Sequence, residues 1–381
     1  MLNCTRLLCS RPGSNDDVRY KSGRPAENNR PVVVWTATRK CNLRCAHCYM
    51  DARPDADAGE LTTAEALAMI DDLAAFGAPA LLFSGGEPLM RDDIFQLGRY
   101  AAGKGLRTAL STNGTLITKE TAARIKDAGF SYAGISLDGL EAANDKFRRS
   151  AGAFKRTLEG IRNCRNAGVR AGLRFTINKH TVGDIAGIFE LIKQEDIRRA
   201  CFYHLVYSGR AGSMVKDDLT AGETRGAMDL IFEKCGQTRG AEILTVDNHT
   251  DGVYLYLRLK RQDPVRAEEA LRLLRINGGN KSGIGIANVD NLGFVHADQF
   301  WGHYSFGNVK EKRFSEIWSD ESDPLLKGLR NRAALLKGKC SRCNFKDLCN
   351  GNFRVRAESV YRDVWQEDPA CYLTEEEVRA I

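Results

Sequence analysis

Short apolar runs alternate with amphipathic stretches along most of the chain. The runs are β-branched or continuously apolar and cover residues 32–37, 80–84, 107–111, 132–137, 171–177 and 201–207. This is typical of strands buried on both faces of a parallel sheet. Helical patterns fall between them, at about residues 92–102, 119–128, 153–166 and 182–194. The clearest helix is expected after Thr62, because Thr62 and Glu65 have the spacing of a capping box.

Six strands that each lead into a helix predict right-handed βα units and an α/β fold. A complete eight-stranded barrel usually needs about 250 residues, so a partial (β/α)6 barrel over residues 31–215 is expected. A polar, basic arm (residues 1–30) precedes it. A charged helical linker (216–280) follows, and then a small cysteine-rich domain with dense turns (281–381).

Composition narrows the class of protein. Of the 381 residues, 43% are hydrophobic and 28% are charged, as in a soluble globular chain. No run approaches the ~18 apolar residues that span a bilayer. The net charge of +7 is mild, so neither nucleic acid nor membrane is an expected partner, whereas an anionic substrate would fit. The twelve cysteines come without a signal-peptide pattern, which predicts a cytoplasmic protein whose clustered thiols bind metal.

The first cluster of thiols is Cys41-Asn-Leu-Arg-Cys45-Ala-His-Cys48, directly after the first predicted strand. Three thiolates on one loop can hold three irons of a four-iron cluster and leave the fourth iron open for a ligand. A zinc ion with His47 as fourth ligand is the alternative. The loop lies at the carboxyl end of a barrel strand, where barrel enzymes place their chemistry, which favours the reactive cluster.

Polar turns end the next three predicted strands. Two glycines let a small molecule approach the backbone, a carboxylate can accept hydrogen bonds from an ammonium group, and short polar side chains suit sugar hydroxyls. Each turn alone is ordinary, but together they predict a small-molecule site at one mouth of the barrel. Its residues are Gly85, Gly86, Glu87, Ser111, Asn113, Asp138 and Arg148.

The spacing Cys41-x3-Cys45-x2-Cys48, followed by Gly85-Gly86-Glu87-Pro88, resembles the radical S-adenosylmethionine (SAM) superfamily over about residues 31–210. The resemblance implies that the three cysteines hold a 4Fe-4S cluster whose open iron binds SAM. Reductive cleavage of SAM then gives a 5′-deoxyadenosyl radical that abstracts hydrogen from a substrate. It also implies a set of SAM contacts: Gly85, Gly86 and Glu87 at the methionine amine, Ser111 and Asn113 near the ribose, His47 and Tyr49 beside the adenine, with Asp138 and Arg148 nearby.

The C-terminal cysteines resemble the SPASM extension of that superfamily. Cys340, Cys343, Cys349 and Cys371 are present, but Phe353 stands where another cysteine is usual, and residues 278–308 contain none. The resemblance implies one auxiliary 4Fe-4S cluster in place of two, with a structural or electron-carrying role. A structural zinc with the same four ligands is the alternative.

Stretches at residues 202–210, 285–290 and 295–301 resemble the tetrapyrrole-modifying members of the superfamily. That implies removal of acetate side chains from didecarboxysiroheme to give iron-coproporphyrin III, with electrons from a reductase, ferredoxin or flavodoxin. A related branch, in heme d1 synthesis, removes propionates from the same precursor. The candidate substrate residues are His204, Arg210, His296, Asp298, Gln299, Trp301 and His303, with one of the three histidines as a ligand of the substrate iron. His180 and His249 stand isolated and receive no role.

Two further functions stay open. One is a peptide-modifying SPASM enzyme, which shares the general architecture. The other is a binding protein held together by zinc, which would contain no iron and bind no SAM.

Overall fold

One curled sheet organises the chain. The computed structural model describes residues 1–13, 16–20 and 30–380, and within them ten strands pair in the order β1-β8-β7-β6-β5-β4-β3-β2-β9-β10. Every pair from β9 through β2 to β8 is parallel, and β1 and β10 pair antiparallel at the two ends. The parallel strands are β2 (Val32–Thr36), β3 (Ala80–Ser84), β4 (Arg107–Thr112), β5 (Tyr132–Ser136), β6 (Ala171–Ile177), β7 (Arg199–His204), β8 (Glu242–Val246) and β9 (Ile286–Val289).

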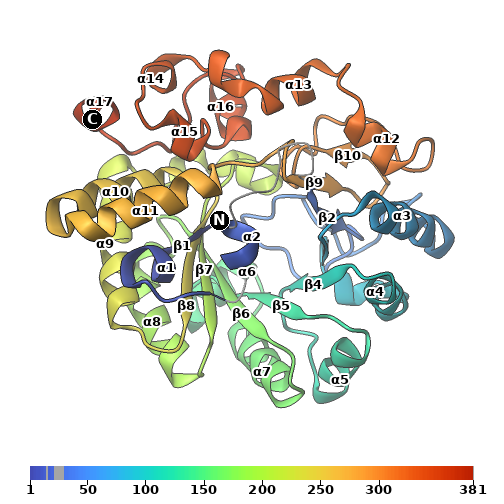
Figure 1. Cartoon of the computed structure of the whole chain (residues 1–381). Coiled ribbons are helices and arrows are strands. Elements are labelled where there is room, and N and C mark those ends of the chain that lie inside the picture. The colour runs from blue at the N-terminus through green and yellow to red at the C-terminus, as the bar shows by residue number, and fades with distance from the viewer. Residues whose placement is uncertain (14–15, 21–29, 381) are drawn as a thin grey trace.

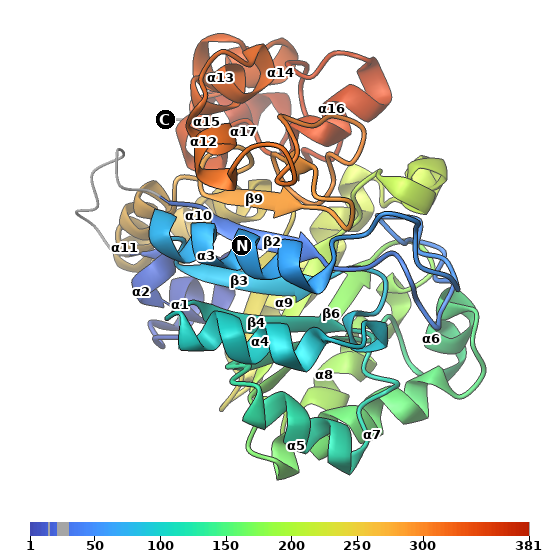
Figure 2. The same ribbon diagram turned by 90° about the vertical axis from the view of Figure 1, so that its right-hand side faces the viewer.

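Helices cover the outer face of the sheet, as Figure 1 shows. They are α3 (Thr63–Phe76), α4 (Ile94–Gly103), α5 (Lys119–Asp127), α7 (Ala153–Asn166), α8 (Ile185–Gln194) and α9 (Ala221–Gln237), whereas α6 (Glu141–Arg148) lies beyond the carboxyl ends of the strands (Figure 2). The capping box predicted for α3 is confirmed, because the Glu65 amide donates to Thr62 Oγ1 and the Glu65 carboxylate accepts from the Thr62 amide at 2.8 Å. The predicted α/β partial barrel is therefore correct.

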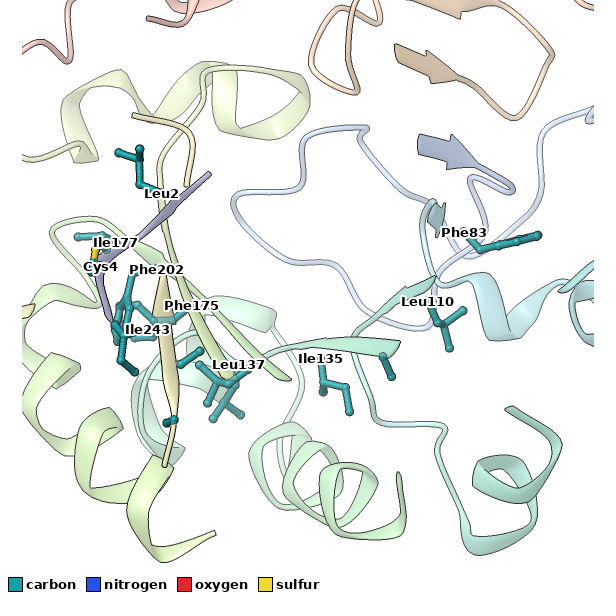
Figure 3. Close-up of a cluster of buried hydrophobic side chains, with 14 of the residues drawn as sticks. Leu2, Cys4, Phe83, Leu110, Ile135, Leu137, Phe175, Ile177, Phe202 and Ile243 are labelled. Atoms are coloured by element: carbon teal, nitrogen blue, oxygen red, sulfur yellow. The ribbon is translucent and has the colours of Figure 1, made fainter. Parts of the chain in front are cut away.

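The core lies between this sheet and its helices. Figure 3 shows side chains from successive strands, among them Leu110, Ile135, Phe175 and Phe202, in one buried cluster. Phe202 of β7 stacks on Phe189 of α8 with ring centroids 5.2 Å apart. Each large apolar side chain buried in this way contributes about 1.5–3 kcal/mol, so the strands are held in register from their outer face.

The region predicted as a helical linker needs correction. Helices α9, α10 (Thr250–Gln262) and α11 (Pro264–Asn277) confirm its helical character, but Glu242–Val246 is strand β8 of the main sheet. Strand β9, expected in the C-terminal domain, pairs with β2 and extends the same sheet. The parallel sheet therefore has two strands more than the six predicted.

The described part of the N-terminal arm packs on the body. Strand β1 (Leu2–Asn3) pairs with β8, and α1 (Cys4–Cys9) contributes the buried Cys4 and Leu7 to the core. Helix α2 (Asp16–Arg19) follows, while residues 14–15 and 21–29 of the predicted arm lie outside the described residues.

Short elements form the C-terminal unit, which lies beside the β9 edge of the sheet and next to α10 and α11 in both views (Figures 1 and 2). A fully buried ion pair joins Arg356 to Asp368, and Arg356 Nη1 also donates to the Leu205 carbonyl just beyond β7. This unit therefore also contacts the chain at the carboxyl end of β7. Its elements are β10 (Val295–His296), α12 (Phe314–Ser319), α13 (Pro324–Arg330), α14 (Gly338–Ser341), α15 (Lys346–Cys349), α16 (Arg354–Tyr361) and α17 (Glu375–Arg379). In the described part of the chain, no helix has the length and apolar character needed to cross a membrane.

Candidate active site

A cavity of about 380 Å³ lies between the carboxyl ends of the strands and the C-terminal unit. Its walls come from the cysteine loop, from the ends of β3 to β8, and from residues 279–282 and 298–300. The sequence-predicted residues that line it are Cys41, Cys45, His47, Cys48, Tyr49, Gly85, Gly86, Ser111, Asn113, Arg148, His204, Arg210, Asp298 and Gln299. The strand order thus brings residues from most of the chain to one site.

The three cysteines of the loop all face this cavity. The amides of Leu43 and Ala52 donate to the sulfurs of Cys41 and Cys48 at 3.4 and 3.3 Å, and Arg148 Nη1 lies 3.9 Å from Cys45 Sγ. Burial raises the pKa of the Cys41 thiol to about 12, so thiolates here need a metal to stabilise them.

This donor set fits the implied cluster. Three sulfurs with amide and guanidinium donors are the ligands that iron–sulfur clusters use. Among the described residues, no three His, Cys, Asp or Glu side chains are gathered so that they could hold a single metal ion.

Gly85 and Gly86 place the turn after β3 directly against the cysteine loop. Gly85 has a φ of +138°, and a Cβ there would lie 2.5 Å from the Thr38 carbonyl oxygen. A Cβ on Gly86 would lie 2.3 Å from the Lys40 carbonyl oxygen. Both contacts are with backbone, which cannot swing aside as a side chain can, so only glycine allows this approach. The close backbone approach that the two glycines allow is therefore to the cysteine loop. Both glycines also line the cavity.

Glu87 is expected to contact a ligand, but in the structure its carboxylate faces hydrogen-bond donors of the protein. Glu87 is fully buried outside the cavity lining, and its carboxylate accepts from Thr112 Oγ1, from the Asn113 amide and from the Leu89 amide at 2.7, 2.8 and 3.2 Å. Burial raises the pKa of Glu87 to about 7. Its carboxylate ties the end of β3 to the end of β4.

The other predicted SAM contacts fall into two groups. Tyr49 and Asn113 point at the cavity with neighbours of their own: the Tyr49 hydroxyl bonds Ser84 Oγ at 2.9 Å, and Asn113 Nδ2 donates to Asn42 Oδ1 at 2.8 Å.

Asp138, in contrast, lies behind the lining. It pairs with Arg148, and its Oδ2 lies 3.2 Å from His47 Nε2, so it orients both side chains. Burial alone would raise the pKa of Asp138, but the Arg148 guanidinium holds it below the usual range.

Arg210 lines the cavity but faces the cysteine loop. It donates to the carbonyls of Cys45 and Ala52 at 2.9 and 2.8 Å and to Asp51 Oδ1 at 2.8 Å. It therefore braces the loop, a role that the sequence did not predict.

Three further residues line the cavity: His204 at the end of β7, and Asp298 and Gln299 from the C-terminal unit. His204 Nε2 lies 3.0 Å from Asp251 Oδ2, and burial raises the pKa of Asp298, whose carboxylate accepts from Ser282 Oγ and from the Phe300 amide. Gln299 Oε1 is buried without a partner within the described residues.

Three candidate substrate residues lie elsewhere. His296 is buried between the Tyr304 carbonyl and Asp290, at 2.8 and 3.3 Å. His303 is half-exposed and pairs with Glu358 at 2.8 Å. Trp301 packs in an apolar cluster behind the cavity wall. Closeness to Asp298 in the sequence therefore did not bring these three side chains to the cavity.

Two cations in the lining lack an acidic partner. Arg174 of β6 is half-buried and donates to Ser111 Oγ, and no carboxylate among the described residues pairs with it. Lys281 is half-buried, and burial followed by the nearby Arg332 lowers its pKa. Arg174 was not among the predicted site residues, although a lone charge in an otherwise apolar strand is a recognisable signal of a functional residue.

The end of β8 adds two more residues that the sequence analysis did not assign. Asp247 has a φ of +66°, and burial raises the pKa of its carboxyl group to about 7. His249 lies two residues further on, and both side chains line the cavity. Both were missed because β8 itself was missed.

The four C-terminal cysteines come together in a second, smaller pocket. Cys340, Cys343, Cys349 and Cys371 all line it, beside Asp368 and Phe345. Burial raises the pKa of Cys340 to about 11, and the Phe345 amide donates to Cys343 Sγ at 3.4 Å. Phe353 lies apart from this pocket, in the wall of the main cavity.

Comparison with known proteins agrees with this geometry. The profile of the Radical SAM superfamily matches residues 35–192. A protein named Fe-coproporphyrin III synthase from Methanosarcina barkeri is 52% identical over 396 residues, which cover 99% of each chain. A pre-heme d1 synthase from Dinoroseobacter shibae is 42% identical over 351 residues, covering 91% of this chain and 87% of the relative.

Solved structures share the fold. The crystal structure of Streptococcus suis SuiB bound to the precursor peptide SuiA has a TM-score of 0.72 and 17% sequence identity, and the match covers 91% of this chain and 76% of SuiB. At this identity the likeness concerns the architecture alone.

Proposed function

The chain belongs to the radical SAM superfamily, and from this premise we propose that it is an enzyme of haem biosynthesis that removes two acetate side chains from didecarboxysiroheme to give iron-coproporphyrin III. The observation that carries the proposal is the 52% identity to Fe-coproporphyrin III synthase over 99% of both chains. The cavity gives this assignment physical support.

The first part of that support is the cluster site. Cys41, Cys45 and Cys48 would hold a 4Fe-4S cluster, with their sulfurs stabilised by backbone amides and by Arg148. Abstraction of a hydrogen atom is the chemistry that SAM bound at such a cluster supplies. The chain's own task is to hold the loop rigid, and Gly86 and Arg210 do so through backbone contacts.

The second part is the charge of the cavity. A tetrapyrrole precursor presents several carboxylates around a flat apolar ring. Carboxylates bind best to guanidinium and ammonium groups, and the ring packs best on aromatic side chains. Within the described residues, Arg174 and Lys281 have no acidic partner, and Tyr49 and Phe300 line the same space. Because a half-buried cation without a counter-charge is costly, a ligand carboxylate is the expected partner of Arg174.

The C-terminal pocket would hold one auxiliary 4Fe-4S cluster. Four cysteines leave no iron open, so it would stabilise the unit or carry electrons. Electrons would come from a cytoplasmic reductase, ferredoxin or flavodoxin.

One anaerobic assay tests the proposal. The purified chain is incubated with SAM, dithionite and a panel of siroheme derivatives, and 5′-deoxyadenosine and pigment mass are followed together. We expect 5′-deoxyadenosine to form with didecarboxysiroheme and the pigment to lose the mass of its two acetate side chains. A variant with Cys41, Cys45 and Cys48 changed to Ala is the control and should form neither product.

The other outcomes separate the alternatives. Loss of propionates would assign the chain to the heme d1 branch, to which its 42% identity with pre-heme d1 synthase also points. An unchanged panel would overturn the tetrapyrrole assignment and favour a peptide substrate. Zinc without iron in the purified protein would favour the binding-protein alternative.

A further inference from the structure

One histidine in the cavity differs from all the others. The chain has six histidines. Five of them have a carboxylate oxygen within 3.3 Å of Nε2, and these pairs are His47 with Asp138, His180 with Asp217, His204 with Asp251, His296 with Asp290, and His303 with Glu358. The sixth, His249, makes no hydrogen bond through either ring nitrogen in the described part of the chain, and its Nδ1 is also shielded from solvent.

The surroundings of His249 hold its ring in place without using its nitrogens. Its backbone amide donates to Asn352 Oδ1 at 2.8 Å, and its ring lies nearly parallel to Phe353, with centroids 6.4 Å apart. The residue is only 6% exposed, and what it faces is the main cavity. A buried polar ring without a partner costs free energy, so a ligand is expected to supply the missing contact.

The imidazole is also in the form that binds metal. Burial lowers the pKa of His249 well below the ordinary value, and the cations Lys281, Arg332 and Arg356 act in the same direction. A neutral imidazole has a free lone pair, which is the donor that haem iron takes from histidine. A hydrogen-bond donor on the ligand would satisfy one nitrogen but would not account for a neutral ring held in place by Phe353 and facing the cavity.

We propose that His249 is the axial ligand of the iron in the tetrapyrrole substrate. The inference rests on the proposed function. One imidazole nitrogen donates its lone pair to the iron in place of a water molecule, and no oxidation or reduction accompanies this step. The ring carboxylates then reach Arg174 and Lys281, which line the same cavity, so the pigment is held in one orientation beside the cysteine loop.

The test compares pigments with and without iron. The full chain is reconstituted with its clusters, without SAM, and titrated with Fe-coproporphyrin III or with metal-free coproporphyrin III. Difference absorption spectra and low-temperature EPR report iron ligation, and porphyrin fluorescence reports binding of the metal-free pigment. For the wild type we expect both pigments to bind and the iron pigment to show the signature of imidazole ligation.

Two variants at one position separate ligation from shape. His249→Ala should lose the ligation signature and bind the iron pigment at least tenfold more weakly, and added imidazole should restore the signature. His249→Phe keeps an aromatic ring against Phe353 and should bind the metal-free pigment like wild type, again without ligation. His303→Ala is the matched control, because His303 is paired outside the cavity, and it should behave like wild type.

Each result decides the matter. If His249→Ala keeps the ligation signature, or the wild type binds both pigments without one, His249 is not the ligand and the proposed function still stands. If His249→Phe weakens both pigments equally, His249 shapes the cavity and the inference is wrong. If the wild type binds neither pigment, the proposed function itself fails.

Discussion

The buried ion pair between Arg356 and Asp368 gives the sharpest test of how the two parts of the molecule hold together. Both side chains are 0% exposed, and Arg356 Nη2 lies 2.9 Å from Asp368 Oδ2. Asp368 also accepts from the amides of Phe353 and Ala370, each at 2.9 Å, while Arg356 donates to the Leu205 carbonyl at the end of the barrel strand. Asp368→Ala would therefore leave a buried guanidinium without its counter-charge.

The expected cost follows from this burial. Removing one partner of a buried pair destabilises a protein by about 3–5 kcal/mol. For a chain of this length, that lowers the apparent Tm by about 4–6 °C. Because Asp368 also lines the pocket of the four C-terminal cysteines, the auxiliary iron should be lost first. The assay is thermal unfolding followed by circular dichroism under anaerobic conditions, together with iron analysis.

Two further variants make the reasoning refutable. Removing both charges, as Arg356→Met with Asp368→Ala, should recover at least half of the lost Tm, because no uncompensated charge remains. Asp363→Ala breaks a surface pair with Lys337 and should lower the Tm much less than Asp368→Ala does. If Asp368→Ala costs no more than Asp363→Ala, or the double variant is as unstable as the single one, the buried pair does not stabilise the C-terminal unit.

Three other predictions concern the two metal sites and the cavity. Gly86→Ala places a Cβ 2.3 Å from the Lys40 carbonyl oxygen, so the cysteine loop must shift, and about half the iron and all SAM cleavage should be lost. The control is Gly103→Ala, which has open space around it. Full iron content in Gly86→Ala would contradict the prediction. Burial raises the pKa of Asp247 to about 7, so the folded protein holds this proton more tightly than the unfolded chain. The resulting stability is fully present below about pH 4 and is lost as the pH rises through about 7, by at most about 4 kcal/mol. Asp247→Asn should show no such loss in a pH series of Tm values, and an identical pH dependence in both proteins would refute this. Cys371→Ala should release the auxiliary iron and expose the last forty or so residues to proteolysis while the barrel keeps its own iron. The control is Cys164→Ala, in the core. Unchanged iron content in Cys371→Ala would count against Cys371 as a cluster ligand.

Local patterns predicted the strands that lead into a helix. Strands β2 to β7 were recognisable because each short run is rich in apolar or β-branched residues and is followed by a helix. Strand β8 was missed because its short run, Ile243 to Val246, stands between charged helices. Strand β9 was assigned to the wrong unit because its partner β2 lies about 250 residues earlier, and no local pattern records such a pairing.

The candidate site also combines features that the local sequence predicts with features that only the fold determines. The cysteine spacings and the glycine pair identify their chemistry without a structure, because ligand spacing and close backbone approach are local properties. The positions of the histidines are not local. His296 and His303 looked suitable through their neighbours in the sequence, whereas His249 was left without a role because only the fold brings it to the cavity and leaves its ring unpaired.

The most direct test of the central claim is to follow the abstracted hydrogen. The reconstituted protein is supplied with SAM, a reductant and uniformly deuterated didecarboxysiroheme, and the 5′-deoxyadenosine and the pigment are analysed by mass spectrometry. If the chain is a radical SAM enzyme of haem biosynthesis, deuterium appears in 5′-deoxyadenosine as the pigment becomes iron-coproporphyrin III. Formation of 5′-deoxyadenosine without deuterium, beside an unchanged pigment, would contradict the account.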